Sequence, residues 1–156
     1  MQIKVRKGTK ADMSHVHALI CELAEYEKAP QEVTNTVEDM VRDGFGEHPV
    51  FHCLVAEFEE KIIGMAIYFI KYSTWKGKGI YLDDIVITET MRGKKVGKQL
   101  FDALMKEAYD LGAQQLHWQV LDWNEPAINF YKKYNAQMDG EWINCKLTRS
   151  ELIHQV

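Results

Sequence analysis

The sequence predicts a mixed α/β fold in which a mostly antiparallel sheet carries helices on both faces. Some stretches repeat apolar residues at helical spacing, whereas others are short apolar blocks typical of strands. The two kinds of stretch do not alternate regularly, which argues against repeated β-α units. The 156 residues suit one domain, residues 1–156, which is long enough to bury a core without disulfides or metal.

The first fifty residues predict one strand, over residues 2–7, and two helices. The helix over residues 11–27 has an apolar face that consists of Val16, Leu19, Ile20 and Leu23. The helix over residues 36–43 begins with a capping box and ends before a glycine. Thr36 and Asp39 form the capping box, and Gly44 is the glycine after the helix.

The middle of the chain predicts strands and then a long helix. Residues 51–58 and 61–72 predict a hairpin, and residues 79–88 predict a further strand. The helix over 96–111 ends at Gly112, where a helix often places a left-handed residue. Its inward positions are Val96, Leu100, Leu104, Ala108 and Leu111.

The last forty residues predict two strands and a short helix. The strands cover residues 114–120 and 141–147, and the helix covers residues 124–134. Asn124 is the expected N-cap of that helix, and Pro126 lies in its first turn. A final helical turn is predicted from its capping residues, Thr148 and Glu151.

Composition narrows the range of partners. The net charge of −4 argues against nucleic acid as the main partner. No apolar run is long enough to cross a bilayer, and the N-terminus lacks the apolar centre of a signal peptide, so we expect a cytoplasmic protein without a membrane partner. The cysteines form no C-x-x-C pair and the histidines form no evident ligand set, so we expect no metal.

A basic loop, MRGKKVGKQL at residues 91–100, lies between an apolar strand and an amphipathic helix. The start of a helix exposes unpaired N–H groups and the positive end of the dipole, which suits an anion. Gly93 and Gly97 allow close backbone approach. The basic residues of the loop are Arg92, Lys94, Lys95 and Lys98. A pyrophosphate would fit here, although a solvated basic turn explains the pattern equally well when it is taken alone.

The pattern Arg92-x-x-Lys95-x-Gly97 resembles the Q/R-x-x-G-x-G/A motif of the GNAT acetyltransferases, which holds the pyrophosphate of CoA. Lys95 stands where that family usually has its central glycine. A lysine there must avoid the backbone region that favours glycine, or accept strain.

Longer strings resemble the diamine acetyltransferases, which include the spermidine/spermine and thialysine types. These strings are ELAEYE (22–27), DGFGEHPVFHCLVAE (43–57), YLDDIVI (81–87) and DWNEPAINFYKKYNA (122–136), together with Trp75. The string LDWN (121–124) is more similar to the thialysine type. The resemblance therefore implies a GNAT fold, acetyl-CoA as co-substrate, a small amine as acceptor and a homodimer.

The resemblance also implies roles for individual residues. The expected acetyl-CoA contacts are Ile85, Val86, Ile87, Arg92, Gly93, Lys94, Lys95, Val96, Gly97, Lys98, Asn124, Glu125, Pro126 and Ala127. The expected amine pocket consists of Tyr26, Glu27, Trp75, Asp83, His117, Trp118 and Gln119. Tyr131 is the general acid that the resemblance implies, although its spacing alone favours a core aromatic. A backbone N–H, that of Val86, is expected to meet the oxyanion at a strand bulge.

Acetylation of an alkylamine requires a proton acceptor, because the amine has a pKa of ~10.4 and only its neutral form attacks a thioester. Asp83 is the expected acceptor, either directly or through a water molecule; it could instead only bind the cation. Glu27, Asp84 and Asp122 are candidates for holding a second ammonium group. Acetylation of another amine and a non-catalytic acetyl-CoA-binding module remain the alternatives.

Overall fold

The computed structural model describes all residues, 1–156, and forms two compact units, Met1–Gln119 and Val120–Val156. The first unit holds a five-stranded sheet in the order β1-β2-β3-β4-β5. Its strands are β1 (Lys4–Lys7), β2 (His52–Phe58), β3 (Lys61–Ser73), β4 (Gly77–Ile87) and β5 (Leu116–His117). All neighbours are antiparallel except β4 and β5, which run parallel, so the predicted mixed and mostly antiparallel sheet is confirmed.

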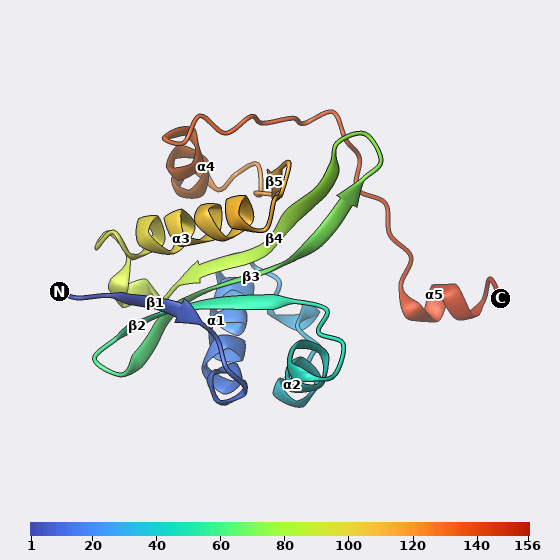
Figure 1. Ribbon diagram of the computed structural model, residues 1–156. Coiled ribbons are helices and arrows are strands. Elements are labelled where there is room, and N and C mark those ends of the chain that lie inside the picture. Colours follow the sequence, from blue (N-terminus) through green and yellow to red (C-terminus); the bar gives the residue numbers. More distant parts are fainter. The chain divides into compact units, whose positions relative to one another are not determined.

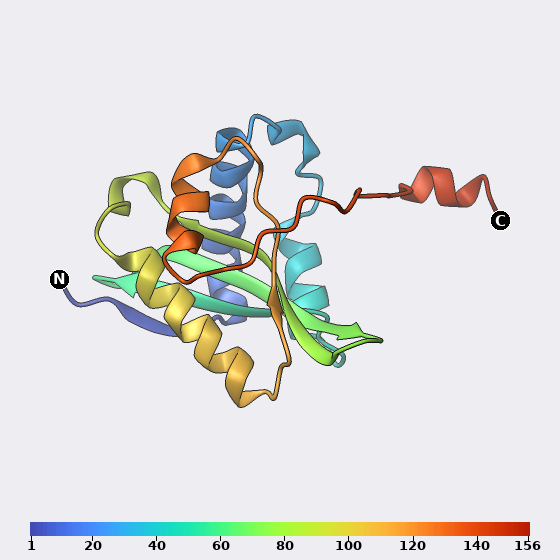
Figure 2. The same ribbon diagram turned by 90° about the horizontal axis from the view of Figure 1, so that it is seen from above.

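Helices cover both faces of this sheet. In Figures 1 and 2, α1 (Met13–Tyr26) and α2 (Val37–Phe45) lie on one face, and α3 (Val96–Asp110) lies on the other. Three short 3-10 helices, η1 (Lys10–Asp12), η2 (Pro30–Glu32) and η3 (Glu89–Met91), join these elements. The second unit contains α4 (Glu125–Lys132) and α5 (Arg149–Ile153). None of the helices has the length and apolar content that a membrane crossing requires.

The core lies on both sides of the sheet, because β2 and β3 alternate their side chains between two covered faces. Toward α1 and α2, the buried residues are Met13, Val16, Leu19, Met40, Cys53, Val55, Met65, Ile67 and Val86. A second cluster joins the start of α3 to the sheet through Ala56, Ile63 and Val96. Burial of these apolar side chains, at ~25 cal/mol per Å², is the main force that holds the helices against the strands.

Two β-bulges interrupt the alternation. Between β2 and β3 the register passes from Gly64 to Ile62, so Ile63 is the extra residue. Between β3 and β4 the register passes from Leu82 to Asp84, so Asp83 is the extra residue. A bulge bends the strand and re-aims the side chains beside it. The second bulge therefore decides how the adjacent carboxylates of β4 are placed.

The predicted start of α2 is confirmed, and its predicted end is wrong. The Thr36 hydroxyl accepts the Asp39 N–H at 3.1 Å, and the Asp39 carboxylate accepts the Thr36 N–H at 3.0 Å. The helix then continues through Gly44 to Phe45. A Cβ on Gly44 would lie 2.3 Å from the Phe51 ring, so this glycine is required for close packing and not for a C-cap. By contrast, Gly112 follows α3 with a φ of 75°, as predicted.

The predicted strands of the last forty residues are shorter than expected or absent. Only Leu116 and His117 of the predicted strand 114–120 form β5. Residues 141–147 form no strand, since no neighbouring strand of the chain offers them a ladder of hydrogen bonds. Trp142 and Ile143 are 78% and 87% exposed there. The predicted caps of α4 and α5 are confirmed: Asn124 accepts the Ala127 N–H, and Thr148 forms a capping box with Glu151.

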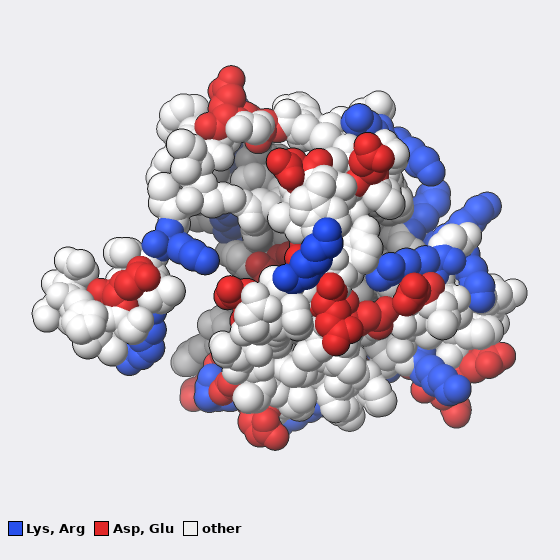
Figure 3. Space-filling view, turned by 180° about the vertical axis from the view of Figure 1, so that it is seen from behind, with Lys and Arg blue, Asp and Glu red and all other residues white.

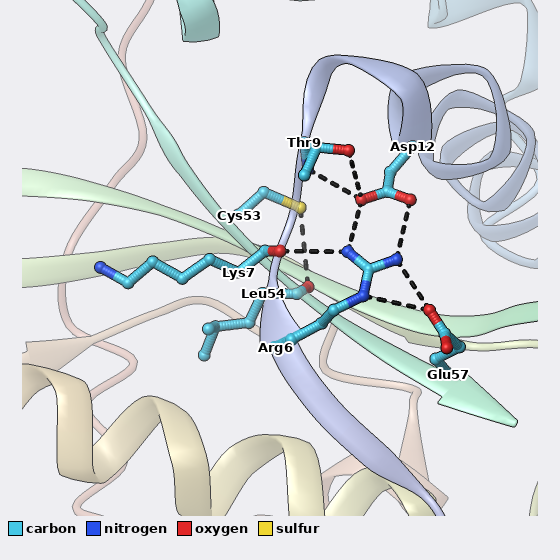
Figure 4. A network of polar contacts seen from close by, with 7 residues as sticks. All are labelled: Arg6, Lys7, Thr9, Asp12, Cys53, Leu54 and Glu57. Carbon is cyan, nitrogen blue, oxygen red and sulfur yellow. Dashed lines mark hydrogen bonds and ion pairs between the residues drawn. The ribbon is translucent and has the colours of Figure 1, made fainter. Parts of the chain in front are cut away.

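Arg6 of β1 joins three segments through a network of charged groups, which Figure 4 shows from close by. Its guanidinium donates to both carboxylate oxygens of Asp12, at 2.7 and 3.1 Å, and to Glu57 of β2 at 2.8 Å. The Thr9 N–H and hydroxyl also donate to Asp12, at 2.8 and 3.0 Å. These hydrogen bonds hold the pKa of Asp12 at about 2, below its ordinary 3.8. The network anchors β1 to the start of α1.

Replacing Asp12 with Ala is expected to destabilise the fold by ~2–3 kcal/mol at pH 7, because the Asp12 pKa is lowered from 3.8 to about 2. This contribution is present above pH ~4 and is lost as the pH falls through about 2. Urea unfolding at pH 7 and at pH 3 measures it. Asp39→Ala, which removes the matching but exposed cap of α2, is the control and should cost less. An Asp12→Ala effect no larger than that of the control would contradict a role for this network in stability.

Candidate functional site

The second half of β4 has an open edge. Strand β5 pairs only with Ile80 and Tyr81 of β4, so its ladder stops before the bulge at Asp83. From there to Ile87, β4 pairs with β3 on one side and with no strand on the other. Open backbone N–H and C=O groups can receive an extended ligand in the manner of an added strand. The stretch 85–87, which the sequence assigns to the co-substrate, lies along this edge.

The loop between β4 and α3 has the backbone geometry of an anion-binding turn. Gly93 has a φ of 76°, and a Cβ there would meet nothing within 4 Å. Lys95, the N-cap of α3, has a φ of 63° and a ψ of 14°. No side chain caps this helix and its first turn contains no acidic residue, whereas the first turn of α2 has two. The N–H groups of the first turn of α3 therefore lack an anionic partner within their own helix.

The basic side chains of this loop differ in their contacts. Arg92 donates to the carbonyl of Ile87 at 3.2 Å, and its guanidinium lies 5.2 Å from the centre of the Tyr26 ring. Lys98 pairs with Asp102 at 2.6 Å. Lys94 donates to the Met91 sulfur, whereas the ammonium of Lys95 makes no hydrogen bond or ion pair and only its backbone carbonyl accepts, from the Gln99 N–H. In Figure 3, Lys and Arg side chains gather at mid-height on the right, the side on which this loop lies.

Lys95 adopts the left-handed conformation that the usual glycine would allow, so the strain foreseen from the sequence is present. Lys95→Gly is expected to raise the free energy of unfolding by ~0.5–1 kcal/mol, since relief of the left-handed penalty exceeds the added chain entropy of glycine. Lys95→Ala removes the ammonium but keeps the strained backbone, so it is the matched control and should not stabilise. Urea unfolding of both variants measures the difference. Equal stability of the two variants would contradict the strain.

Three carboxylates gather where β4 passes the end of α1. Glu27 is the C-cap of α1, and Asp83 and Asp84 lie at the β4 bulge. Burial raises the pKa of Glu27 and of Asp83. The pKa of Asp84 rises to about 7, mainly through burial and further through the charges of Asp83 and Glu27. Because Asp84 is opposite Ile67, whose side chain lies in the cluster against α1, its carboxyl faces the α1 side of the sheet.

A carboxylate with a pKa near 7 is unusual and chemically useful. A proton acceptor works best when its pKa lies near the working pH, which holds for Asp84 and not for an ordinary aspartate. The sequence assigns the role of base to Asp83 and that of a cation anchor to Asp84. The stronger perturbation of Asp84 could not be foreseen from the sequence, because it depends on the bulge and on the approach of Glu27.

The other expected pocket residues of the first unit divide into two groups. His117 of β5 lies edge-on to Tyr81, with ring centres 5.4 Å apart, on the strand next to the carboxylates. Trp118 instead packs edge-on against Phe101 of α3, at 5.4 Å, and Gln119 ends the unit. Trp75 is 89% exposed and lies in the turn between β3 and β4. It is six residues beyond Phe69, which is the β3 residue opposite Tyr81. The fold of this unit thus brings Glu27, Asp83 and His117 to one region and leaves Trp75 at the end of the hairpin.

Two further residues of this region have no role in the sequence interpretation. Lys71 of β3 places its Nζ 3.0 Å from His117 Nδ1 and 5.1 Å from the centre of the Tyr81 ring. The charges of Asp83 and Asp84, together with burial, raise the pKa of Tyr81. The alternation of side chains along β3 and β4 is the signal that could have placed Lys71 and Tyr81 on the face of the site.

The second unit contains the remaining expected site residues. Asn124 Oδ1 accepts the Ala127 N–H at 3.4 Å, which starts α4 with Glu125 and Pro126 in its first turn. Tyr131 is buried, with its ring edge-on to Phe130 at 5.4 Å. The expected start of this helix is therefore confirmed, while the role of Tyr131 as an acid stays a prediction.

Comparison with known proteins identifies relatives of this chain. The sequence profile described as "Acetyltransferase (GNAT) family" matches residues 16–136. The chain is 39% identical over 164 aligned positions to "Thialysine N-epsilon-acetyltransferase" of Bos taurus, covering 99% of this chain and 96% of that protein. It is 30% identical to "Spermidine/spermine N(1)-acetyltransferase-like protein 1" of Homo sapiens over 96% of this chain and 23% of that longer protein. An integron cassette protein from the mobile metagenome of V. cholerae has a similar fold, with a TM-score of 0.79 and 24% identity, over 99% of this chain and 98% of that one.

Proposed function

Because the chain belongs to the GNAT family of acetyltransferases, which transfer acetyl groups to amines, we propose that it acetylates the primary amine of a small polyamine, diamine or thialysine-like substrate. The reaction is direct attack on acetyl-CoA in a ternary complex. The observation that carries the proposal is the group of three carboxylates at the end of α1, all with raised pKa values. They suit both the binding and the deprotonation of a cationic amine.

The loop before α3 and the open edge of β4 fit acetyl-CoA. The uncapped N–H groups at the start of α3 and the nearby ammonium of Lys95 suit a pyrophosphate. The edge of β4 at 85–87 offers backbone groups to the extended arm that carries the acetyl group. The backbone of Val96 and Gly97 serves this site, because the Val96 side chain is buried in the core. Asn124, Glu125, Pro126 and Ala127 form the start of a second helix in the proposed contact set.

The proposed reaction moves two protons. The amine gives a proton to a carboxylate of the β4 bulge, its nitrogen then forms the C–N bond, and the C–S bond breaks. The departing thiolate takes a proton, which we assign to Tyr131, and the acylated nitrogen gives up its second proton, which restores the Tyr131 phenol. Deprotonation of an alkylamine at pH 7 costs ~4–5 kcal/mol, so a carboxylate with a pKa near 7 is a far better acceptor than one near 4. The raised pKa of Asp84 therefore favours Asp84 as the proton acceptor. In this proposal Asp83 raises the pKa of Asp84 and binds the cation.

We assign the oxyanion to a backbone N–H of β4. The bulge is at Asp83 and not beside Val86, where the sequence analysis expected it. The Val86 side chain is in the core against α1, so only its backbone is available to the reaction. Glu27 and Tyr26 at the end of α1 complete the proposed amine pocket with His117, whereas Trp118 packs against Phe101 of α3.

The experiment that tests this function is release of free CoA thiol from acetyl-CoA across a panel of amines. The panel contains spermidine, putrescine, thialysine, an aminoglycoside and a peptide N-terminus. Turnover with diamines or thialysine supports the proposal. Turnover only with the aminoglycoside or the peptide would replace the substrate class. Acetyl-CoA binding without turnover of any amine would favour a binding module over an enzyme.

We also propose that the protein is a single acetyltransferase domain that forms a homodimer. The family profile spans residues 16–136 and so crosses the boundary between the two compact units. Residues 141–147 expose Trp142, Ile143 and Leu147 and pair with no strand of their own chain. A second copy is the proposed cover for this apolar segment. Sedimentation equilibrium of the wild type and of Trp142→Glu tests it: a monomeric wild type would exclude the homodimer.

A further inference from the structure

Lys71, Tyr81 and His117 form a cationic site on the same face of the sheet as Asp84. Tyr81 is opposite Phe69 of β3 and opposite His117 of β5, so these three side chains share a face. On β3, Lys71 lies two residues after Phe69, and Ile67 lies two residues before Phe69. Ile67 is the β3 residue opposite Asp84. Side chains two residues apart on a strand point to the same face. Lys71 and Asp84 therefore lie on one face of adjacent strands.

The charge at this site is positive. The Lys71 ammonium donates to His117 Nδ1 at 3.0 Å, and burial together with the Lys71 charge lowers the pKa of His117. His117 is therefore neutral near pH 7. No carboxylate lies within ion-pair distance of Lys71, whereas Lys98 and Lys106 each have an acidic partner. The contact with the Tyr81 ring holds the ammonium in place but does not cancel its charge.

We propose that Lys71, assisted by His117, is an anion subsite that binds the carboxylate of an amino-acid substrate whose side-chain amine enters the Glu27, Asp83 and Asp84 cluster. This inference rests on the proposed function and narrows its substrate class. A charged hydrogen bond from Lys71 favours a carboxylate at that end of the pocket. The same ammonium repels the second ammonium of a diamine or polyamine. Lys71 is therefore a residue that determines specificity, and it has no part in the chemical step.

The spacing along β4 between the Lys71 subsite and the Asp84 carboxylate fits such a substrate. Tyr81, over which the Lys71 ammonium lies, precedes Asp84 by three residues of β4. Three strand residues span ~10 Å, and the bulge shortens this distance. An extended basic amino acid with a long side chain, such as lysine or ornithine, separates its carboxylate and its terminal amine by a comparable length. A substrate with the amine close to the carboxylate would not reach both ends.

The test compares L-lysine with cadaverine, which is lysine without its carboxylate. For Lys71→Met, kcat/KM for L-lysine is expected to fall ~10- to 100-fold, the loss of one charged hydrogen bond, while kcat/KM for cadaverine stays level or rises. Lys71→Glu should reverse the preference of the wild type. Lys78→Met is the matched control, because Lys78 lies on the same hairpin opposite Tyr72 and faces away from the site. An equal change for the two amines in Lys71→Met would overturn the proposal.

A measurement of L-lysine binding distinguishes failure of the anion subsite from failure of the proposed function. If the wild type acetylates neither amine, the proposed function fails, and the subsite is judged from the rise in melting temperature that L-lysine produces. Loss of that rise in Lys71→Met, with the rise intact in Lys78→Met, supports the subsite. An identical rise in all three proteins, or none in the wild type, excludes it. The melting temperatures without ligand show whether each variant is folded.

Discussion

Asp84→Asn is expected to lower kcat/KM for the amine substrate by roughly 100- to 10,000-fold, the usual effect of losing a general base. That loss corresponds to ~3–5 kcal/mol of transition-state stabilisation. The physical reason is the pKa of about 7, which allows Asp84 to be ionised at neutral pH and still hold an amine proton better than an ordinary aspartate. For the wild type, kcat/KM should rise with pH and level off above pH ~7. In Asp84→Asn this inflection should disappear.

Asp83→Asn is the matched control for this prediction. It removes one of the charges that raise the pKa of Asp84, so the inflection should move to lower pH while much of the activity remains. The opposite pattern, with the inflection lost in Asp83→Asn and kept in Asp84→Asn, would assign the base to Asp83 as the sequence analysis expected. Steady-state rates from pH 5 to 9 distinguish the two results.

Stability gives an independent check on the same carboxylate. A raised pKa means that the folded state favours protonated Asp84, so the protein loses stability as the pH rises from near 4 to about 7. Asp84→Asn should therefore melt at a higher temperature than the wild type at pH 8. A less active but more stable variant is the signature of a strained functional group. A variant that loses both activity and stability would show instead that Asp84 supports the fold.

Tyr131→Phe is expected to lower kcat by roughly 100-fold or more with little change in the affinity for acetyl-CoA, because only the proton donor is removed. The ring of Tyr131 is buried and packs against Phe130, and phenylalanine keeps that packing. Steady-state kinetics and calorimetric titration of acetyl-CoA measure the two quantities. Tyr134→Phe is the matched control, since Tyr134 also lies against Phe130, at 5.4 Å.

Substrate choice adds a sharper test of the acid. A proton donor matters less when the leaving thiolate is already stable, so the penalty of Tyr131→Phe should shrink with an acetyl thioester of lower thiol pKa. An unchanged kcat in Tyr131→Phe would remove Tyr131 from the mechanism. A loss of acetyl-CoA affinity as large as the loss of kcat would make Tyr131 a binding residue.

Local patterns of the sequence were sufficient for most helices and strands. The apolar spacing of residues 11–27 and 96–111 predicts α1 and α3 to within a few residues, because each helix buries one face against the sheet. The capping box of α2 and Gly112 after α3 were also predictable, since caps depend on residues close in the chain. The basic loop could be placed for the same reason. Strands at 114–120 and 141–147 could not, because a strand exists only where a partner offers its hydrogen bonds.

By itself, then, the sequence determined the type of most elements, because this depends on residue type and local spacing. Its resemblance to the diamine acetyltransferases indicated the family and the chemical class of the reaction. The tertiary structure decided which carboxylate has the raised pKa. Asp84 reaches about 7 because the bulge at Asp83 and the end of α1 bring three carboxylates together. It also decided that Lys71 of β3 meets His117 of β5 across β4, a contact between residues 46 positions apart. Such contacts depend on strand order and register, which no local pattern specifies.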